Sequence, residues 1–254
     1  MGLTEKERIK RRFTQSHATY DEHAEAQKRI CAHLIDLLCQ FSGSRFRRIL
    51  EIGYGSGAFT RLLKQRCAVD EWVLNDLCES WEAPIQELFP THPPLFLTGD
   101  AETLAFPGNL DLVASASAFQ WMKDLPRFIR KLSAHLSPQG LLVFNTFAPD
   151  NLREIKAITG EGLTYPTTSL LREWLSADFH ILHEEEQAIP LTFPDPIDVL
   201  RHLKYTGVTA NASGPWTRGK QETFRQEYRE RFSTPDRQVT LTYHPLYIIA
   251  IKKQ

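Results

Sequence analysis

Several features that would place the chain in a special class are scarce or missing from its sequence. There are only four cysteines, Cys31, Cys39, Cys67 and Cys78, and none belongs to a Cys-x-x-Cys pair or a histidine-rich stretch. A disulfide framework and a structural zinc site are therefore not indicated, and we interpret the cysteines as reduced, mostly buried thiols. No apolar run reaches the roughly 18 residues that a membrane span needs, and the basic N-terminus lacks the apolar segment of an export signal. We expect a cytoplasmic protein with no membrane partner.

An excess of charge of one sign is missing too. The chain has 30 Lys and Arg residues against 31 Asp and Glu residues, a formal net charge of -1. A general nucleic-acid binder should carry a clear basic excess, so we expect no nucleic-acid partner. Hydrophobic residues make up 42% of the 254 positions, which excludes disorder and allows a sizeable core in one or two domains.

What the sequence does contain is a regular alternation of short apolar segments and amphipathic segments. Apolar residues at three- and four-residue spacing predict a helix over 21–41, with Asp21 as its N-cap and Ser42-Gly43-Ser44 at its end. Strands are predicted at 49–52, 71–74, 94–98, 110–114 and 141–147, and helices between them at 58–66, 83–89 and 126–136. This alternation indicates an α/β fold with a parallel sheet and helices on both faces.

The second half of the chain departs from this rhythm. Helices at 152–158 and 169–175 precede a sixth strand at 180–187, and a long strand at 241–253 ends the chain. About fifty residues lie between these two strands, and they include helix-like stretches at 198–207 and 220–232. We therefore predict a helical insertion over the sheet.

A glycine-rich stretch follows the first predicted strand. Residues 51–57 read Glu-Ile-Gly-Tyr-Gly-Ser-Gly and lead directly into a helix. Glycines at alternate positions let the backbone turn sharply and leave no Cβ to obstruct a ligand. A tight connection without a ligand is the alternative, but the strand before and the helix after the motif favour a ligand site.

Three acidic residues accompany the ends of the first three predicted strands. Asp76 lies nineteen residues after Gly57, where a carboxylate can accept both hydroxyls of a ribose, and Asp100 could accept a hydrogen bond from an adenine amino group. Glu51 adds a negative charge that disfavours a pyrophosphate and suits an ammonium or sulfonium group. Each acid alone could be a solvated loop residue or a helix N-cap, but their shared position favours a cationic nucleoside ligand.

This pattern resembles the class I S-adenosylmethionine-dependent methyltransferases over residues 46–147. The resemblance implies a Rossmann-like fold with a mostly parallel seven-stranded sheet, S-adenosyl-L-methionine as cofactor and S-adenosyl-L-homocysteine as product. It also implies glycines under the methionine part of the cofactor, Glu51 near its amino group, Asp76 at the ribose and Asp100 at the adenine. The cofactor-binding residues implied in this way are Glu51, Gly53, Gly55, Gly57, Asp76, Leu77, Asp100, Ala101 and Ser115.

Four further segments, 19–27, 117–121, 200–207 and 241–244, are similar to the malonyl-acyl-carrier-protein O-methyltransferase family of biotin synthesis. This narrower resemblance runs nearly end to end and implies methyl transfer to the free carboxylate of a malonyl thioester, with an acyl carrier protein as partner. We expect a monomer with a single domain over 1–254. Its expected parts are an N-terminal helical arm (1–45), a cofactor-binding core (46–147), helices and a sixth strand (148–188), a helical lid (189–238) and a final strand (239–254).

The resemblance also suggests how the substrate is held. A carboxylate is ionised at neutral pH, so its attack on a methyl group needs positioning and exclusion of water, and we predict no general base. Arg201 is the expected anchor for the malonyl carboxylate, since a guanidinium is a two-pronged donor, although it could also be a surface residue of the lid. We expect Tyr20 to close over the site, Phe119 and Trp121 to form an apolar wall, and Lys204 to lie near Arg201 on a basic surface for the acidic carrier.

Other functions fit parts of the pattern. The enzyme could methylate another small carboxylic acid or the ring of a quinone precursor. Gly53, Gly55 and Ala58 also satisfy a loose dinucleotide motif, which would suit a nicotinamide-dependent dehydrogenase. A cofactor-sensing protein without catalytic activity is a further alternative.

Overall fold

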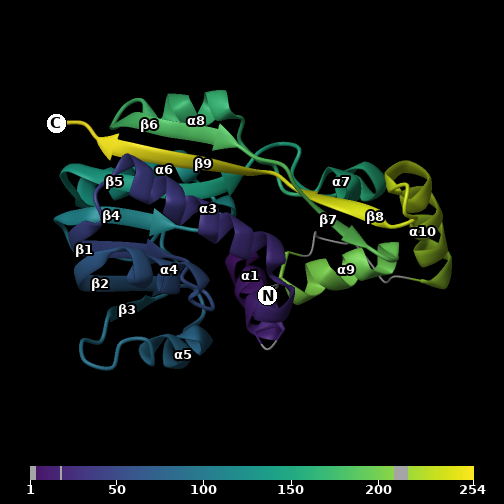
Figure 1. Cartoon of the computed structure of the whole chain (residues 1–254), viewed down its shortest axis with the longest axis horizontal. Helices are drawn as coiled ribbons and strands as arrows, with labels where there is room; N and C mark the ends of the chain where they lie inside the picture. The colour runs from purple at the N-terminus through teal and green to yellow at the C-terminus, as the bar shows by residue number, and fades with distance from the viewer. Residues whose placement is uncertain (1–3, 18, 209–216) are drawn as a thin grey trace.

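The computed structural model describes residues 4–17, 19–208 and 217–254, and its centre is a seven-stranded sheet in the order β3-β2-β1-β4-β5-β9-β6 (Figure 1). The strands from β3 to β5 are parallel to their neighbours, and β9 is antiparallel to β5 and β6. This confirms the predicted Rossmann-like, mostly parallel sheet. Its strands are β1 Arg45–Ile52, β2 Ala68–Asp76, β3 Leu95–Thr98, β4 Leu110–Ser115, β5 Leu136–Phe147, β6 Phe179–Glu186 and β9 Pro245–Lys252.

Helices cover both faces of the sheet because its central strands are apolar on both sides. In β1, Ile49 packs into the cluster with α3 and α4, and the next residue, Leu50, packs into the cluster with α6 and α8. The helices around the core are α4 Ala58–Arg66, η1 Glu79–Trp81, α5 Glu82–Gln86, η2 Phe119–Trp121, α6 Leu125–His135, α7 Arg153–Thr159 and α8 Thr168–Leu175. The predicted alternation of strands and helices is therefore confirmed, with shifts of a few residues at the ends.

The N-terminal arm consists of α1 Glu5–Ser16, α2 Tyr20–His23 and α3 Glu25–Phe41. The prediction of one helix over 21–41 is wrong at its start, because Ala24 has φ -81° and ψ 41° and interrupts the helix. Asp21 is consequently not an N-cap and lies inside α2. The predicted end is right, since α3 ends at Phe41.

The sequence predicted a purely helical insertion after β6, and this prediction is wrong. It contains β7 Ile189–Phe193, α9 Pro196–Tyr205 and α10 Arg218–Phe232, and β7 pairs with β8 Val239–Tyr243 in a separate two-stranded sheet. The expected final strand is therefore two strands that meet at His244. The alternating apolar residues of β8 are buried against the insertion, and β9, which begins at Pro245, joins the main sheet. Residues 209–216 of the expected lid lie outside the described residues.

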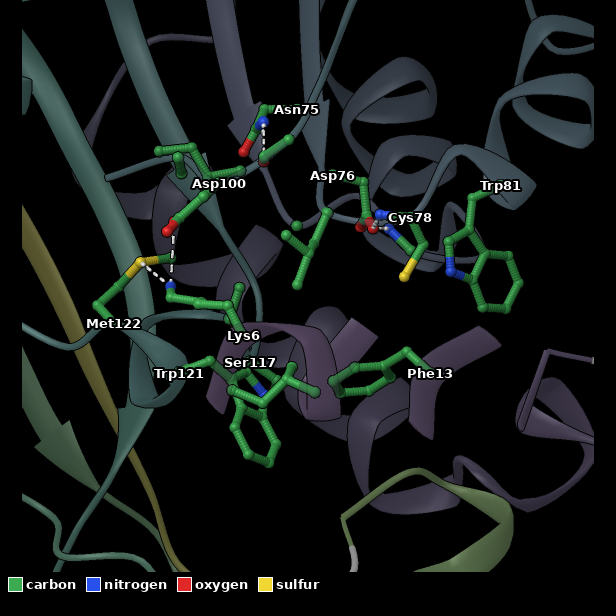
Figure 2. A pocket seen from close by; sticks show the side chains of 18 of the residues that line it. Lys6, Phe13, Asn75, Asp76, Cys78, Trp81, Asp100, Ser117, Trp121 and Met122 are labelled. Carbon is green, nitrogen blue, oxygen red and sulfur yellow. Dashed lines mark hydrogen bonds and ion pairs between the residues drawn. The ribbon is translucent and has the colours of Figure 1, made fainter. Parts of the chain in front are cut away.

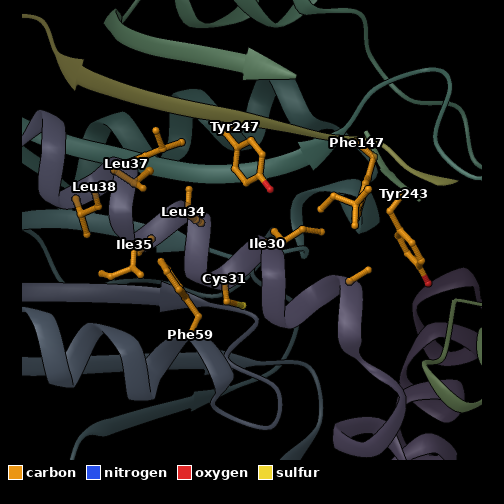
Figure 3. Packing of buried hydrophobic residues seen from close by; sticks show 14 of the residues in the cluster. Ile30, Cys31, Leu34, Ile35, Leu37, Leu38, Phe59, Phe147, Tyr243 and Tyr247 are labelled. Carbon is orange, nitrogen blue, oxygen red and sulfur yellow. The ribbon is translucent and has the colours of Figure 1, made fainter. Parts of the chain in front are cut away.

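The largest hydrophobic cluster joins the arm, the sheet and the insertion. Ile30 and Leu34 of α3 are fully buried and belong to one cluster with Tyr247 of β9 and Tyr243 of β8 (Figure 3). Helix α3 covers one face of the sheet, whereas α1 and the insertion lie beside the carboxyl ends of the parallel strands, with α1 between the sheet and α9 (Figure 1). In the described ranges, no helix has the length and apolar character that crossing a membrane would require.

Candidate active site

A cavity of about 750 Å³ opens where β1, β2, β3 and β4 end, and α1 lies across it (Figure 2). The strand order reverses between β1 and β4, and ligands of open α/β sheets bind at such a reversal. We call it the cofactor cavity; its lining includes Lys6, Phe13, Tyr20, Gly53, Gly55, Asp76, Leu77, Gly99, Asp100, Ala101, Ser117 and Trp121.

The glycine-rich loop forms one wall of the cavity; its three glycines all have a positive φ, and at two of them a side chain would also meet a neighbour. Gly53 has φ +72°, and a Cβ there would lie 2.5 Å from the Cβ of Ala118. Gly57 has φ +80°, and a Cβ there would lie 2.1 Å from Cδ1 of Ile85. Gly53 and Gly55 line the cavity, whereas Gly57 does not and is the N-cap residue of α4.

Asp76 ends β2 and holds the glycine loop in place. Its Oδ2 accepts a hydrogen bond from the backbone N–H of Gly55 at 2.9 Å, and its Oδ1 accepts one from the N–H of Cys78 at 2.8 Å. Burial raises the pKa of Asp76 to about 6, although these backbone donors act in the opposite direction. Each carboxylate oxygen keeps a lone pair that can accept a ligand hydroxyl.

Glu51 does not line the cavity; it lies buried at the start of the loop, with 1% of its surface exposed. Its Oε2 atom has no hydrogen-bond partner among the described residues. Burial raises the pKa of Glu51 to about 8; the nearby Thr60 hydroxyl opposes the rise, and the Asp76 charge adds to it. A buried carboxyl group without a partner beside a glycine loop fits a ligand with a cationic group.

Asp100 lies on the opposite side of the cavity and is engaged by a residue that sequence reasoning missed. Lys6 of α1 places its Nζ 3.1 Å from Oδ1 of Asp100 and 2.8 Å from Oε2 of Glu102 (Figure 2). Because Lys6, Ile9 and Phe13 are spaced three and four apart and all line the cavity, the helical periodicity of residues 5–16 could have revealed this face.

The remaining predicted cofactor residues are divided between the cavity and the core. Leu77 and Ala101 line the cavity. Ser115 is fully buried, and its hydroxyl donates to the carbonyl oxygen of Ile52 at 2.8 Å. It therefore joins β4 to β1 and supports the loop from behind.

The predicted substrate residues are only partly brought together. Tyr20 and Trp121 line the cofactor cavity, and Trp121 makes an edge-to-face contact with Phe13 at 5.6 Å between ring centroids. The prediction for Phe119 is wrong, because its fully buried ring stacks on Phe144 in the core. The physical reason is that the short helix η2 turns Phe119 under the sheet and Trp121 toward the cavity.

Arg201 and Lys204 lie on the exposed face of α9, and neither lines the cofactor cavity. The Arg201 side chain is 62% exposed and donates to Asp198 at 2.8 Å, one helical turn earlier. The expectation that Arg201 anchors the malonyl group inside the cavity is therefore not met by this arrangement. The helix buries Val199, His202 and Leu203 instead, which turns both basic residues outward.

Known proteins with the same features define the class. A family described as "Methyltransferase domain" matches residues 50–144 of the chain. The N-methyltransferase NodS from Bradyrhizobium japonicum, solved in complex with S-adenosyl-L-homocysteine, shares the fold with a TM-score of 0.55 and 13% identity over 88% of this chain and 86% of that one. The fold and the matched segment make the chain a methyltransferase with a Rossmann-like core.

More similar relatives identify the family. A malonyl-[acyl-carrier protein] O-methyltransferase from Porphyromonas gingivalis is 48% identical over 96% of this chain and 95% of its own length. One from Haemophilus ducreyi is 40% identical over 100% of this chain and 99% of its own length. The chain belongs to the malonyl-[acyl-carrier protein] O-methyltransferase family.

Proposed function

We propose that this protein transfers a methyl group from S-adenosyl-L-methionine to the free carboxylate of a malonyl thioester on an acyl carrier protein. The product would be the methyl ester used in biotin (pimeloyl) synthesis. The observation that carries this proposal is the cavity at the strand ends, where Asp76 and Asp100 flank a glycine loop with the unpaired Glu51 behind it. The similarity to family members over nearly their whole length supports the choice of acceptor.

The residues around the cavity fit the cofactor chemically. Asp76 would accept the ribose hydroxyls, Glu51 would compensate the ammonium group, and Gly53 and Gly55 would allow close approach of the methionine part. Asp100 would face the adenine and would also keep its ion pair with Lys6. When bound, S-adenosyl-L-methionine supplies an electrophilic methyl group on a positively charged sulfur.

The protein's own part in the reaction is to position the carboxylate and exclude water. A carboxylate attacks without losing a proton, so no general base is required. Phe13 and Trp121 cover the cavity with apolar surface, which strengthens the attraction between the carboxylate and a cationic centre. Burial raises the pKa of Tyr20 far above neutrality, so its hydroxyl stays protonated and can donate to a substrate oxygen.

The exposed positions of Arg201 and Lys204 suit a partner surface better than a substrate pocket. Both lie on α9, and Lys220 and Arg218 begin α10 in the same insertion. An acyl carrier protein is strongly acidic, so such residues would speed its association through long-range attraction. We further propose that the enzyme acts as a cytoplasmic monomer without nucleic-acid or membrane partners.

A single comparison tests the proposed function. Purified protein is incubated with cofactor carrying a labelled methyl group and with malonyl- and succinyl-acyl-carrier proteins in parallel. We expect label on the malonyl carrier, with a base-labile methyl ester detected by mass spectrometry. Labelling of another carboxylic acid or of a quinone precursor, with the malonyl carrier unchanged, would disprove the assigned acceptor.

A further inference from the structure

A second, smaller space of about 370 Å³ adjoins the cofactor cavity. We call it the acceptor chamber. It shares Phe13, Tyr20, Ser117 and Trp121 with the cofactor cavity, so the two spaces meet at these side chains. The other lining residues of the chamber are uncharged, and its polar groups are amides and hydroxyls such as Gln27, Gln120 and Asn151.

A groove leads from the chamber toward the surface of the molecule. It shares Trp121, Asn151, Leu163, Tyr165 and Val208 with the chamber. Its outer part lies between α1 and α7, where the charged residues Arg12, Lys156 and Glu161 line it. Trp121 therefore borders all three spaces, and groove, chamber and cofactor cavity follow one another in a row.

Two polar side chains that line both the groove and the chamber, Asn151 and Tyr165, are fixed by hydrogen bonds. Asn151 donates from Nδ2 to the Tyr165 hydroxyl at 2.9 Å and accepts from the backbone N–H of His244 at 2.9 Å, so its orientation is fixed. The Tyr165 hydroxyl is the acceptor in this pair and keeps its own proton for another acceptor. Burial raises the pKa of Tyr165 to about 12, which keeps that proton in place at neutral pH.

Two buried amide oxygens in the chamber wall also lack a hydrogen-bond partner among the described residues. These are the Oε1 atoms of Gln27 and Gln120. Gln27 is only 6% exposed. Leaving such an atom unpaired is unfavourable, so a ligand with N–H groups would be stabilised here.

We propose that the groove and the chamber receive the amide-bearing arm of an acyl thioester, and that Tyr165 positions the acyl end beside Trp121 at the cofactor cavity. This inference rests on the proposed function and adds the route of the substrate. The arm of an acyl carrier protein and that of coenzyme A share this chemistry: amide N–H groups, a phosphate and a terminal thioester. The phosphate suits the exposed Lys156 ammonium at the mouth, and the amides suit the unpaired oxygens.

Four full-length proteins test the route: wild type, Leu163→Trp, Tyr165→Phe and the control Leu182→Trp. Leu163 is half-buried at the junction of groove and chamber, whereas Leu182 is 41% exposed on β6. The substrates are malonyl-acyl-carrier protein, malonyl-coenzyme A and the short malonyl-N-acetylcysteamine thioester. Steady-state kinetics are measured with each, and S-adenosyl-L-homocysteine affinity is measured by calorimetry.

We expect Leu163→Trp to lower kcat/KM at least tenfold with the two long substrates and less with the short one, because the new ring fills the groove. Tyr165→Phe should raise KM several-fold with all three substrates and leave kcat within about threefold. Both variants should bind S-adenosyl-L-homocysteine like wild type, and Leu182→Trp should change nothing. An equal kcat/KM for malonyl-coenzyme A and malonyl-acyl-carrier protein would support the route, because it would show that the enzyme recognises the arm without the rest of the carrier protein.

Wild-type turnover by Leu163→Trp would overturn the route, as would an equal loss with long and short substrates. Because Lys156 is exposed, the Lys156→Glu variant should fold normally. It should lower kcat/KM only with the phosphate-bearing substrates. If the wild type methylates none of these acceptors, the proposed function fails. Calorimetric binding of malonyl-coenzyme A to the wild type and to Leu163→Trp then still decides whether the groove holds the arm.

Discussion

Glu51 offers the sharpest test of the cofactor site, because the structure links its stability and its function. The carboxyl group is buried, and its pKa rises from 4.5 to about 8. The folded protein therefore binds this proton more tightly than the unfolded chain does. The free energy of unfolding should consequently fall as the pH rises from about 4.5 to about 8.

The magnitude follows from the pKa. Each tenfold change in an acid constant corresponds to about 1.4 kcal/mol, so an ionised Glu51 should cost the empty protein about 4–5 kcal/mol at alkaline pH. Glu51→Gln keeps a neutral side chain of the same size and removes this cost. At roughly 2–4 °C per kcal/mol, the variant should melt about 10 °C higher than wild type at pH 8.5 and at nearly the same temperature near pH 4.5.

The same substitution should damage cofactor binding. A ligand ammonium group near Glu51 would favour the ionised carboxylate, so binding to the wild type should release a proton between about pH 5 and pH 8. Calorimetry with S-adenosyl-L-homocysteine in buffers of different ionisation enthalpy measures this release. Glu51→Gln should abolish the release from this group and weaken affinity at least tenfold.

Glu87→Gln is a matched control, since Glu87 is exposed on the surface. Its melting temperature should follow that of the wild type at every pH. The reasoning about Glu51 is refuted if Glu51→Gln and wild type have parallel stability curves between pH 4.5 and pH 8.5. A variant that gains stability but keeps full affinity would instead remove Glu51 from the cofactor site.

Three further changes test other parts of the site. Asp76→Asn should weaken S-adenosyl-L-homocysteine binding about 10- to 100-fold by calorimetry, and unchanged affinity would exclude a ribose contact. Lys6→Met removes the ion pairs with Asp100 and Glu102, so amide hydrogens of α1 should exchange faster by mass spectrometry; unchanged exchange would show that α1 is held by packing alone. Gly57→Ala should lower the free energy of unfolding by at least about 1–2 kcal/mol in urea, since φ is +80° and Ile85 blocks the new Cβ; wild-type stability would contradict this geometry.

Much of the cofactor half of the protein could be predicted from its sequence, because the relevant signals are local. The apolar segments and their spacing predicted strands and helices, and the glycine loop lies at the end of β1 as expected. Asp76 and Asp100 reach one cavity because parallel strands end at the same edge of a sheet. No knowledge of distant contacts was needed for these conclusions.

The substrate half was predicted less well, because side-chain direction there depends on long-range packing. Phe119 and Trp121 are two residues apart, yet the first is fully buried in the core and the second lines the cavity. The burial of His202 and Leu203 turns Arg201 to the outside of α9. Packing against the neighbouring elements sets which face of a helix is buried, and a short sequence pattern does not specify this.

The sequence by itself determined the class of this protein: an alternating α/β core, a glycine loop and acids at the strand ends, all set by spacing along the chain. Only the tertiary structure decided that α1 covers the cavity, that Lys6 reaches Asp100, and that β8 leaves the main sheet. The physical reason is that these contacts join residues far apart in sequence. They form where exposed apolar surfaces of the arm, the sheet and the insertion are buried against one another.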